Sequence, residues 1–191
     1  VLMKKSIVLA VIAVTLLSIS FAVATLIIAS KCGLSIIVHG NAAAGEVDGI
    51  VFLAVWGKNQ WSSYAKAKLW VDMNLDSIEN ISFNYLKVLG CTTPYIVIEV
   101  DTDGDSIPDT WLVQYPEKAL KPFTWVINDN DDWRIVPGSK VHYTLSEIKA
   151  MLDGKVTAIK IAVGWWKSKA LANVFFVAGL QVNGQYLLNP P

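Results

Sequence analysis

The sequence predicts an all-β protein: an antiparallel β-sandwich of the jelly-roll kind with one short helix, preceded by an N-terminal hydrophobic helix. Roughly ten short strand-like segments, separated by turn residues, follow one another along most of the chain, which is typical of two packed antiparallel sheets. Helical spacing is found in one further segment, and an uncharged apolar run stands apart at the start. We expect three regions: 1–30, 31–47 and one folded domain over 48–191.

The apolar run, residues 7–29, carries no charge and follows Lys4 and Lys5. About 20 such residues suffice to cross a bilayer, so the run is either a secretory signal peptide or a membrane-spanning helix. Ala22-Val23-Ala24 offers a small-x-small cleavage site, whereas a retained helix would anchor the chain in the membrane or pack in a filament core. Cleavage and retention both remain open, and either one predicts an extracellular or cell-surface protein.

The next region contains a strand-like piece followed by small residues. Residues 34–38 (LSIIV) form a short strand-like piece, and 40–45 (GNAAAG) resemble a flexible tether in composition. We expect a detached strand that pairs with a neighbouring subunit's open sheet edge, with Leu34, Ile36 and Val38 filling its groove.

From residue 48 onward the patterns change to strands. Residues 50–56 (IVFLAVW) are continuously apolar, as in a strand buried on both faces, and 65–73 alternate between apolar residues and Lys66, Lys68 and Trp70. The same alternation recurs at 81–85. Two more strands, 95–100 and 110–115, flank an aspartate-rich loop.

The last third predicts a helix and a closing hairpin. Thr144 and Glu147 form a capping-box pattern at the start of a helix over 145–153, and Gly154 ends it. Long strands follow at 156–165 and 173–182. Asn183-Gly184 is a strong hairpin turn leading into a short strand at 186–188.

The loop DTDGDSIPD suggests a metal site. Its aspartates stand at positions 1, 3, 5 and 9, and position 7 offers a backbone carbonyl, so the predicted ligands are Asp101, Asp103, Asp105, Ile107 and Asp109. Carboxylate-rich oxygen ligation favours Ca²⁺ over zinc or copper. An EF-hand is excluded, because glycine is missing at position 6 and glutamate at position 12. The alternative is a solvated acidic turn.

The same loop resembles the DxDGDGxxD calcium loops of thrombospondin type 3 repeats and related secreted domains. Asp101, Asp103, Gly104, Asp105 and Asp109 match that pattern, and Ser106 replaces its second glycine. The resemblance covers about nine residues and implies calcium binding outside the cell.

Three smaller features fit an exported chain. Cys32 and Cys91 either form a disulfide or are two unlinked thiols. Asn80 begins an N-glycosylation sequon. Trp70, Trp165 and Trp166 are candidates for outward-facing aromatics that bind sugars or protein partners, the alternative being ordinary packing.

Composition and the missing motifs argue against two classes of function, nucleic-acid binding and catalysis. The net charge is zero, which argues against a nucleic-acid partner. The usual hydrolase and nucleotide-binding motifs are missing from the sequence, so we do not expect an enzyme. We expect a cell-surface structural protein that polymerises with itself or with other surface subunits. The runner-up is a membrane-anchored carbohydrate-binding or adhesion module, with glycans as partners.

Residues 53–60 (LAVWGKNQ) and the lysine-rich strand after them resemble the calcium-dependent cannula subunits of hyperthermophilic archaea. Those subunits build extracellular tubules. The resemblance implies calcium-dependent assembly outside the cell and assigns no role to any single residue.

Overall fold

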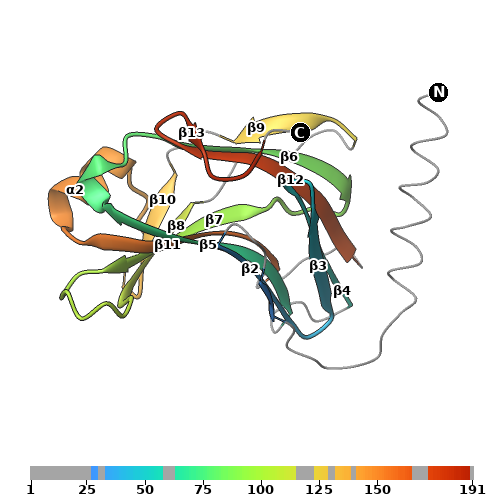
Figure 1. Ribbon diagram of the computed structural model, residues 1–191, viewed down its shortest axis with the longest axis horizontal. Helices are drawn as coiled ribbons and strands as arrows, with labels where there is room; N and C mark the ends of the chain where they lie inside the picture. Colours follow the sequence, from blue (N-terminus) through green and yellow to red (C-terminus); the bar gives the residue numbers. More distant parts are fainter. Residues whose placement is uncertain are drawn as a thin grey trace.

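Two antiparallel sheets pack face to face in the computed structural model, which describes residues 27–29, 33–57, 63–114, 123–128, 132–138, 141–164 and 172–189 (Figure 1). The seven-stranded sheet has, in order, β1 (Ile27–Ala29), β2 (Leu34–His39), β5 (Tyr64–Asn74), β11 (Lys155–Gly164), β7 (Tyr95–Asp101), β8 (Thr110–Gln114) and β10 (Trp133–Val136). The six-stranded sheet has β3 (Ala42–Val47), β4 (Ile50–Trp56), β12 (Ala172–Val182), β6 (Ile81–Leu89) and β9 (Trp125–Asn128), with β13 (Gln185–Tyr186) beside β12. The predicted antiparallel sandwich is confirmed.

Period-two patterning sorts side chains between the core and the outer faces. In β5, Ala65, Ala67 and Leu69 are buried between the sheets, and Lys66 and Lys68 project from the opposite face. Across the interface, β4, β6 and β12 contribute an equally apolar inner face that includes Leu53, Phe83 and Phe175. One continuous core therefore joins both sheets.

The predicted helix and hairpin are both present. Helix α2 spans Leu145–Met151, and its capping box is complete: the Thr144 hydroxyl accepts a hydrogen bond from the Glu147 N–H, and the Glu147 carboxylate accepts one from the Thr144 N–H. A 3-10 turn, η2 (Leu75–Ser77), precedes β6. Asn183 and Gly184 have φ values of 52° and 78°, as the tight turn between β12 and β13 requires.

The prediction of a detached strand on a tether is wrong. Strand β2 pairs with β5 of its own chain, Leu34 lying opposite Leu69, and Leu34, Ile36 and Val38 are only 2%, 2% and 8% exposed. The small residues after it form β3, which pairs with β4.

The predicted N-terminal helix lies outside the described residues. Within the described part of the chain, no helix has the length and apolar character needed to cross a membrane.

Candidate functional site

The aspartate loop connects β7 to β8. Asp101 is the last residue of β7 and is 3% exposed. Its two carboxylate oxygens accept hydrogen bonds from the backbone N–H groups of Gly104 (2.8 Å) and Ser106 (2.9 Å), so the chain wraps around this side chain. At the other end of the loop, the Asp109 N–H donates to the Val100 carbonyl (3.1 Å). Asp101 thus anchors the loop from the end of a buried strand.

Three of the predicted ligands come together. Oxygen atoms of Asp101, Asp103 and Asp109 all lie within 4.8 Å of one another, a cluster that could hold a metal ion. Asp105 is not part of this cluster: it is exposed, and its carboxylate accepts a hydrogen bond from the Ile107 N–H (2.7 Å). The Ile107 side chain is 66% exposed. A ligand role for the Ile107 carbonyl stays a prediction.

Hydrogen bonds favour the ionised form of two of these carboxylates. Burial acts to raise the pKa of Asp101, but hydrogen bonds from Gly104 and Ser106 outweigh it and hold the pKa below its usual value. The Thr102 hydroxyl and N–H lower the pKa of Asp109 in the same way. Both carboxylates are therefore negative at neutral pH, as a cation site requires.

The backbone of the loop needs two left-handed residues. Gly104 has φ +82° and Ser106 has φ +69°. Glycine adopts this conformation without steric cost, whereas serine does not. Gly154, which follows α2, packs closely against the end of β7. A Cβ at this position would lie 2.7 Å from the Asp101 carbonyl oxygen, so a larger residue would displace the start of the loop.

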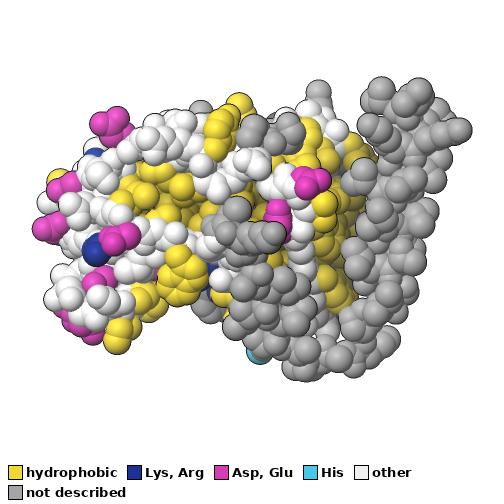
Figure 2. All heavy atoms as spheres, viewed as in Figure 1, with side chains coloured by type: hydrophobic (Ala, Val, Ile, Leu, Met, Phe, Trp, Pro, Cys, Tyr) yellow, Lys and Arg dark blue, Asp and Glu magenta, His cyan; other side chains and the backbone are white. Residues whose placement is uncertain are grey.

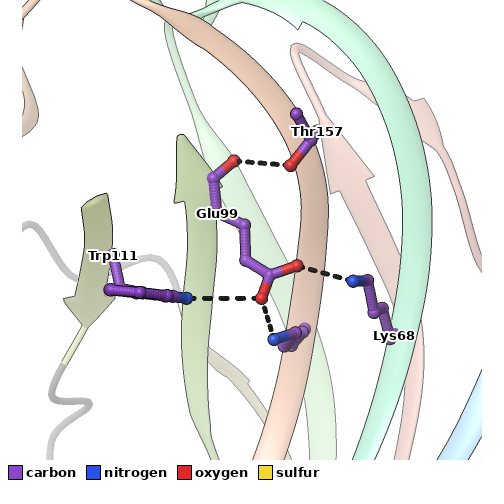
Figure 3. Close-up of polar contacts among 5 residues, drawn as sticks. Lys68, Glu99, Trp111 and Thr157 are labelled. Atoms are coloured by element: carbon purple, nitrogen blue, oxygen red, sulfur yellow. Dashed lines mark hydrogen bonds and ion pairs between the residues drawn. The ribbon is translucent and has the colours of Figure 1, made fainter. Parts of the chain in front are cut away.

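A second charged cluster lies on the outer face of the seven-stranded sheet and was not predicted from the sequence. Glu99 of β7 is 5% exposed and forms ion pairs with Lys68 of β5 (2.7 Å to Oε2) and with Lys160 of β11 (Figure 3). The Trp111 indole N–H donates to the same carboxylate (3.3 Å), and the Thr157 hydroxyl donates to the Glu99 carbonyl (3.4 Å).

The pKa values of two lysines on this face, Lys66 and Lys160, are lowered. Burial raises the pKa of Glu99, but its ion pairs with Lys160 and Lys68 outweigh that effect and lower the pKa. Burial, then repulsion from Lys160, lowers the pKa of Lys66 to about 8, although Glu99 acts in the opposite direction. Burial also lowers the pKa of Lys160. The Lys66 ammonium lies 3.9 Å from the Tyr64 ring centroid, and that of Lys68 lies 3.5 Å from the Trp70 ring centroid.

The remaining predicted residues are placed only in part. Trp70 is 58% exposed on the lysine-bearing face, as an outward aromatic should be. Cys91 and Asn80 are exposed, and the disulfide and the glycan stay predictions. Cys32, Trp165 and Trp166 lie outside the described residues.

The outer face of the six-stranded sheet is apolar. Residues directly opposite one another in antiparallel strands point to the same face. One row crosses β3, β4, β12, β6 and β9 and consists of Gly45, Phe52, Phe176, Leu86 and Trp125. Two parallel rows add Ala43, Ala54, Val174 and Leu89, and Ala178, Asn84 and Ile127. None of these described residues is charged. We call these three rows the apolar face.

Figure 2 shows hydrophobic side chains over β3, β4 and β12 and also between β12 and β11, and most of the visible charged side chains lie around α2 and the β7–β8 loop. Leu89, Ile127 and Trp125 are 51%, 64% and 37% exposed. Elsewhere on the apolar face Ala54, Val174 and Ala178 are at most 2% exposed, and Phe52, Phe176 and Leu86 are half-buried, so its exposed part lies on β6 and β9. Large exposed apolar patches mark interaction surfaces.

No family model and no curated protein matches this chain. Among solved structures, a loop-swap mutant of Xyn11A from Necallimastix patriciarum is similar to it, with a TM-score of 0.32 and 13% sequence identity over 74% of this chain and 94% of the other. A likeness this distant is no argument about function.

Proposed function

We propose that the protein is an exported structural subunit, stabilised by calcium and without catalytic activity, that assembles with copies of itself into a cell-surface filament, tubule or layer. The observation that supports this most directly is the apolar face. An antiparallel sheet that faces water normally carries polar residues on its outer side. Here the outer side has the composition of a packing surface instead.

The proposed contact is face to face between two copies. Sheets stack about 10 Å apart when their side chains interdigitate. The row from Phe52 through Phe176 to Trp125 offers aromatic and aliphatic groups of the kind found at interface centres, and Phe52 and Phe176 already contact each other at 5.6 Å between ring centroids. Because β2 belongs to its own sheet, this contact replaces strand addition as the proposed mode of assembly.

Assembly is tested by placing a charge on the apolar face. The substitution Ile127→Lys places an ammonium group on an exposed position of β9 that the contact would bury. Sedimentation velocity should therefore show monomers for this variant and larger species for the native chain. Met151→Lys is the matched control, because Met151 is similarly exposed (53%) but lies on α2. Negative-stain microscopy then identifies filaments, tubes or layers. Monomers of the unmodified chain at all concentrations, with and without calcium, would overturn the proposal.

Calcium is the proposed ion, because the cluster offers only carboxylate oxygens. At a free concentration 100 times its dissociation constant, an ion bound only by the folded state adds about 2.7 kcal/mol to the free energy of unfolding. Calorimetry with calcium and with chelator should therefore show a higher Tm with the ion. Asp103→Asn should abolish that increase, and Asp76→Asn, an exposed aspartate in η2, should retain it. An unchanged Tm for the native chain would remove calcium from the proposal.

A second candidate function is a carbohydrate-binding or adhesion module, anchored to the membrane if residues 7–29 are retained. The exposed Trp70, on the same face as three lysines, favours it. Glycan binding by a chain that stays monomeric would favour this module over the structural subunit.

A further inference from the structure

We propose that Asn80 carries an N-linked glycan, and that this glycan is attached before β6 pairs with β12. The acceptor motif is Asn80-Ile81-Ser82, and the other nine of the chain's ten asparagines stand outside any such motif. This inference rests on the export that the proposed function includes, because N-linked glycans are carried by secreted chains. It does not depend on assembly or on calcium.

The first step is the exposure of the acceptor side chain. Asn80 lies between η2 and β6 and is exposed. Asn183 fixes its main chain: the Asn80 carbonyl accepts a hydrogen bond from the Asn183 N–H (2.9 Å), and the Asn80 N–H donates to Asn183 Oδ1 (3.2 Å). Within the described part of the chain, no group forms a hydrogen bond with the side-chain amide of Asn80. A glycan on its Nδ2 atom would therefore extend into solvent and displace no hydrogen bond.

Asn183, the neighbouring asparagine, provides the contrast. Its Oδ1 also accepts a hydrogen bond from the Glu79 N–H (2.8 Å), and its Nδ2 donates to the Ser77 carbonyl (2.6 Å). Both ends of this amide are thus engaged in holding η2 and the start of β6 against the β12–β13 turn. The two asparagines have different roles, because Asn183 stabilises the local structure and Asn80 presents a free amide.

The second step concerns Ser82, the hydroxyl residue that the motif requires. Ile81 and Ser82 begin β6 and are 4% and 5% exposed. Gln181 of β12 donates a hydrogen bond from its Nε2 to the Ser82 hydroxyl (2.8 Å), and the two residues are cross-strand partners. An enzyme that recognises this hydroxyl would have to separate the two strands. The motif is therefore closed in the folded chain, which places the modification before this strand pair forms.

The transfer needs an activated sugar, and a lipid-linked oligosaccharide phosphate is the co-reactant. The Asn80 Nδ2 atom attacks the anomeric carbon of that sugar, and a bond forms between the two atoms. The bond from the anomeric carbon to the phosphate oxygen breaks, and the lipid phosphate leaves with its electron pair. The amide nitrogen loses one proton to a base of the enzyme. The step involves no oxidation or reduction.

The glycan would leave the molecule at the α2 end. The Lys149 ammonium of α2 donates a hydrogen bond to the carbonyl of Ile78, two residues before Asn80 (3.1 Å). Figure 1 shows η2 and its connection to β6 beside α2. Leu89, an exposed residue of the apolar face, is nine residues from Asn80, which is about 30 Å along an extended strand. The glycan and Leu89 would thus lie at opposite ends of β6.

The test is cell-free translation of the full chain with endoplasmic-reticulum microsomes, which contain the transferring enzyme and its lipid-linked donor. Protection from added protease reports import, and intact mass reports modification. We expect imported chains to gain the mass of one glycan. A glycan-releasing amidase should remove it and convert the Asn80 side chain to a carboxylic acid.

Substitutions assign the gain in mass to this motif. Asn80→Gln and Ser82→Ala should each abolish it, and Ser82→Thr should retain it. Asn84→Gln is the matched control, because Asn84 lies on the same strand outside the motif, and it should leave the gain unchanged. These outcomes do not require the variants to fold, because the modification precedes folding.

The order of events is tested with detergent-released enzyme and lipid-linked oligosaccharide. A peptide of residues 76–86 should be modified, and the chain that has already folded without a glycan should remain unmodified. Equal modification of both would overturn the proposed order. Imported chains without a glycan would overturn the inference and leave the structural subunit untouched, whereas chains that stay outside the microsomes would contradict export itself and remove the premise of the inference.

Discussion

At the scale of single residues, Glu99 supplies negative charge to Lys68 and Lys160 on the outer face of the seven-stranded sheet. It is the carboxylate that both Lys68 and Lys160 contact, and all three side chains are mostly removed from water. Removing one member of a buried ion cluster is costly, because the remaining charges keep their desolvation penalty and lose their partner.

We therefore predict that Glu99→Gln lowers the free energy of unfolding by about 3 kcal/mol near pH 7. Because the folded-state pKa of Glu99 is lowered, its stabilisation is present above its unfolded pKa and is lost as pH falls through the folded pKa. Urea unfolding measures the change. Glu79→Gln, at an exposed glutamate, should alter stability very little. A Glu99→Gln variant as stable as the native chain would mean that the lysines do not need this carboxylate.

Lys66 gives a second pH dependence of the same sense, at alkaline instead of acidic pH. Its pKa is about 8 in the folded chain, below the ordinary value of 10.5, because of burial and then repulsion from Lys160. The unfolded chain thus holds the proton more tightly, so stability rises with pH between about 8 and 10. Lys66→Met should be more stable than the native chain by about 1–2 kcal/mol at pH 7, after allowance for partial exposure, and the difference should vanish near pH 10.

Urea titrations at several pH values check this difference. The difference between the two chains isolates the contribution of Lys66 together with its electrostatic coupling to Lys160 and Glu99. A constant difference from pH 7 to 10 would contradict the lowered pKa.

At the scale of structural elements, the β7–β8 loop contains a residue that is poorly suited to its backbone. Ser106 has φ +69° and contributes only its N–H to Asp101. Ser106→Gly keeps that hydrogen bond and removes the steric cost of a left-handed serine, so we predict a gain of about 1 kcal/mol in the free energy of unfolding. Ser146→Gly, in the first turns of α2, should instead lose about 0.5 kcal/mol. A loss at both positions would show that the serine is accommodated without strain.

Strand β2 gives the second prediction at this scale. Ile36 is 2% exposed in the shared core, so Ile36→Ala should cost about 2–4 kcal/mol. Ile37→Ala, on the outer face opposite Lys66, should cost clearly less. Both losses, measured by urea unfolding, should be independent of protein concentration, because β2 pairs within its own chain. In the non-assembling Ile127→Lys background, stability that rises with concentration would indicate that β2 is exchanged between copies.

These elements also show what the sequence could predict. Alternation in β5 and the capping box of α2 are local patterns, and both were read correctly. The aspartate pattern of the β7–β8 loop is also local, and three of its four aspartates lie together, whereas Asp105 is outside the cluster. Strand β2 was misplaced, because a short apolar segment predicts a strand without identifying its partner strand. Glu99 and Lys160 lie 61 residues apart, so their contact depends on strand order, which no local pattern specifies.

At the scale of the whole molecule, the two sheets share one core and present two unlike outer faces. The apolar face belongs to β3, β4, β12, β6 and β9, and the charged aromatic face belongs to β5, β11, β7 and β8. The core between them separates the two surfaces by the thickness of the sandwich. Substitutions on opposite faces share no partners, so their effects should add.

The last prediction combines one substitution from each face. Ile127→Lys should prevent assembly and leave the stability gain of Lys66→Met unchanged, whereas Lys66→Met should leave assembly unchanged. The double variant should show both effects, each of the size found in the single variant, by sedimentation velocity and urea unfolding at pH 7. An assembly defect in Lys66→Met, or a different stability gain in the Ile127→Lys background, would show that the two faces are coupled through the core.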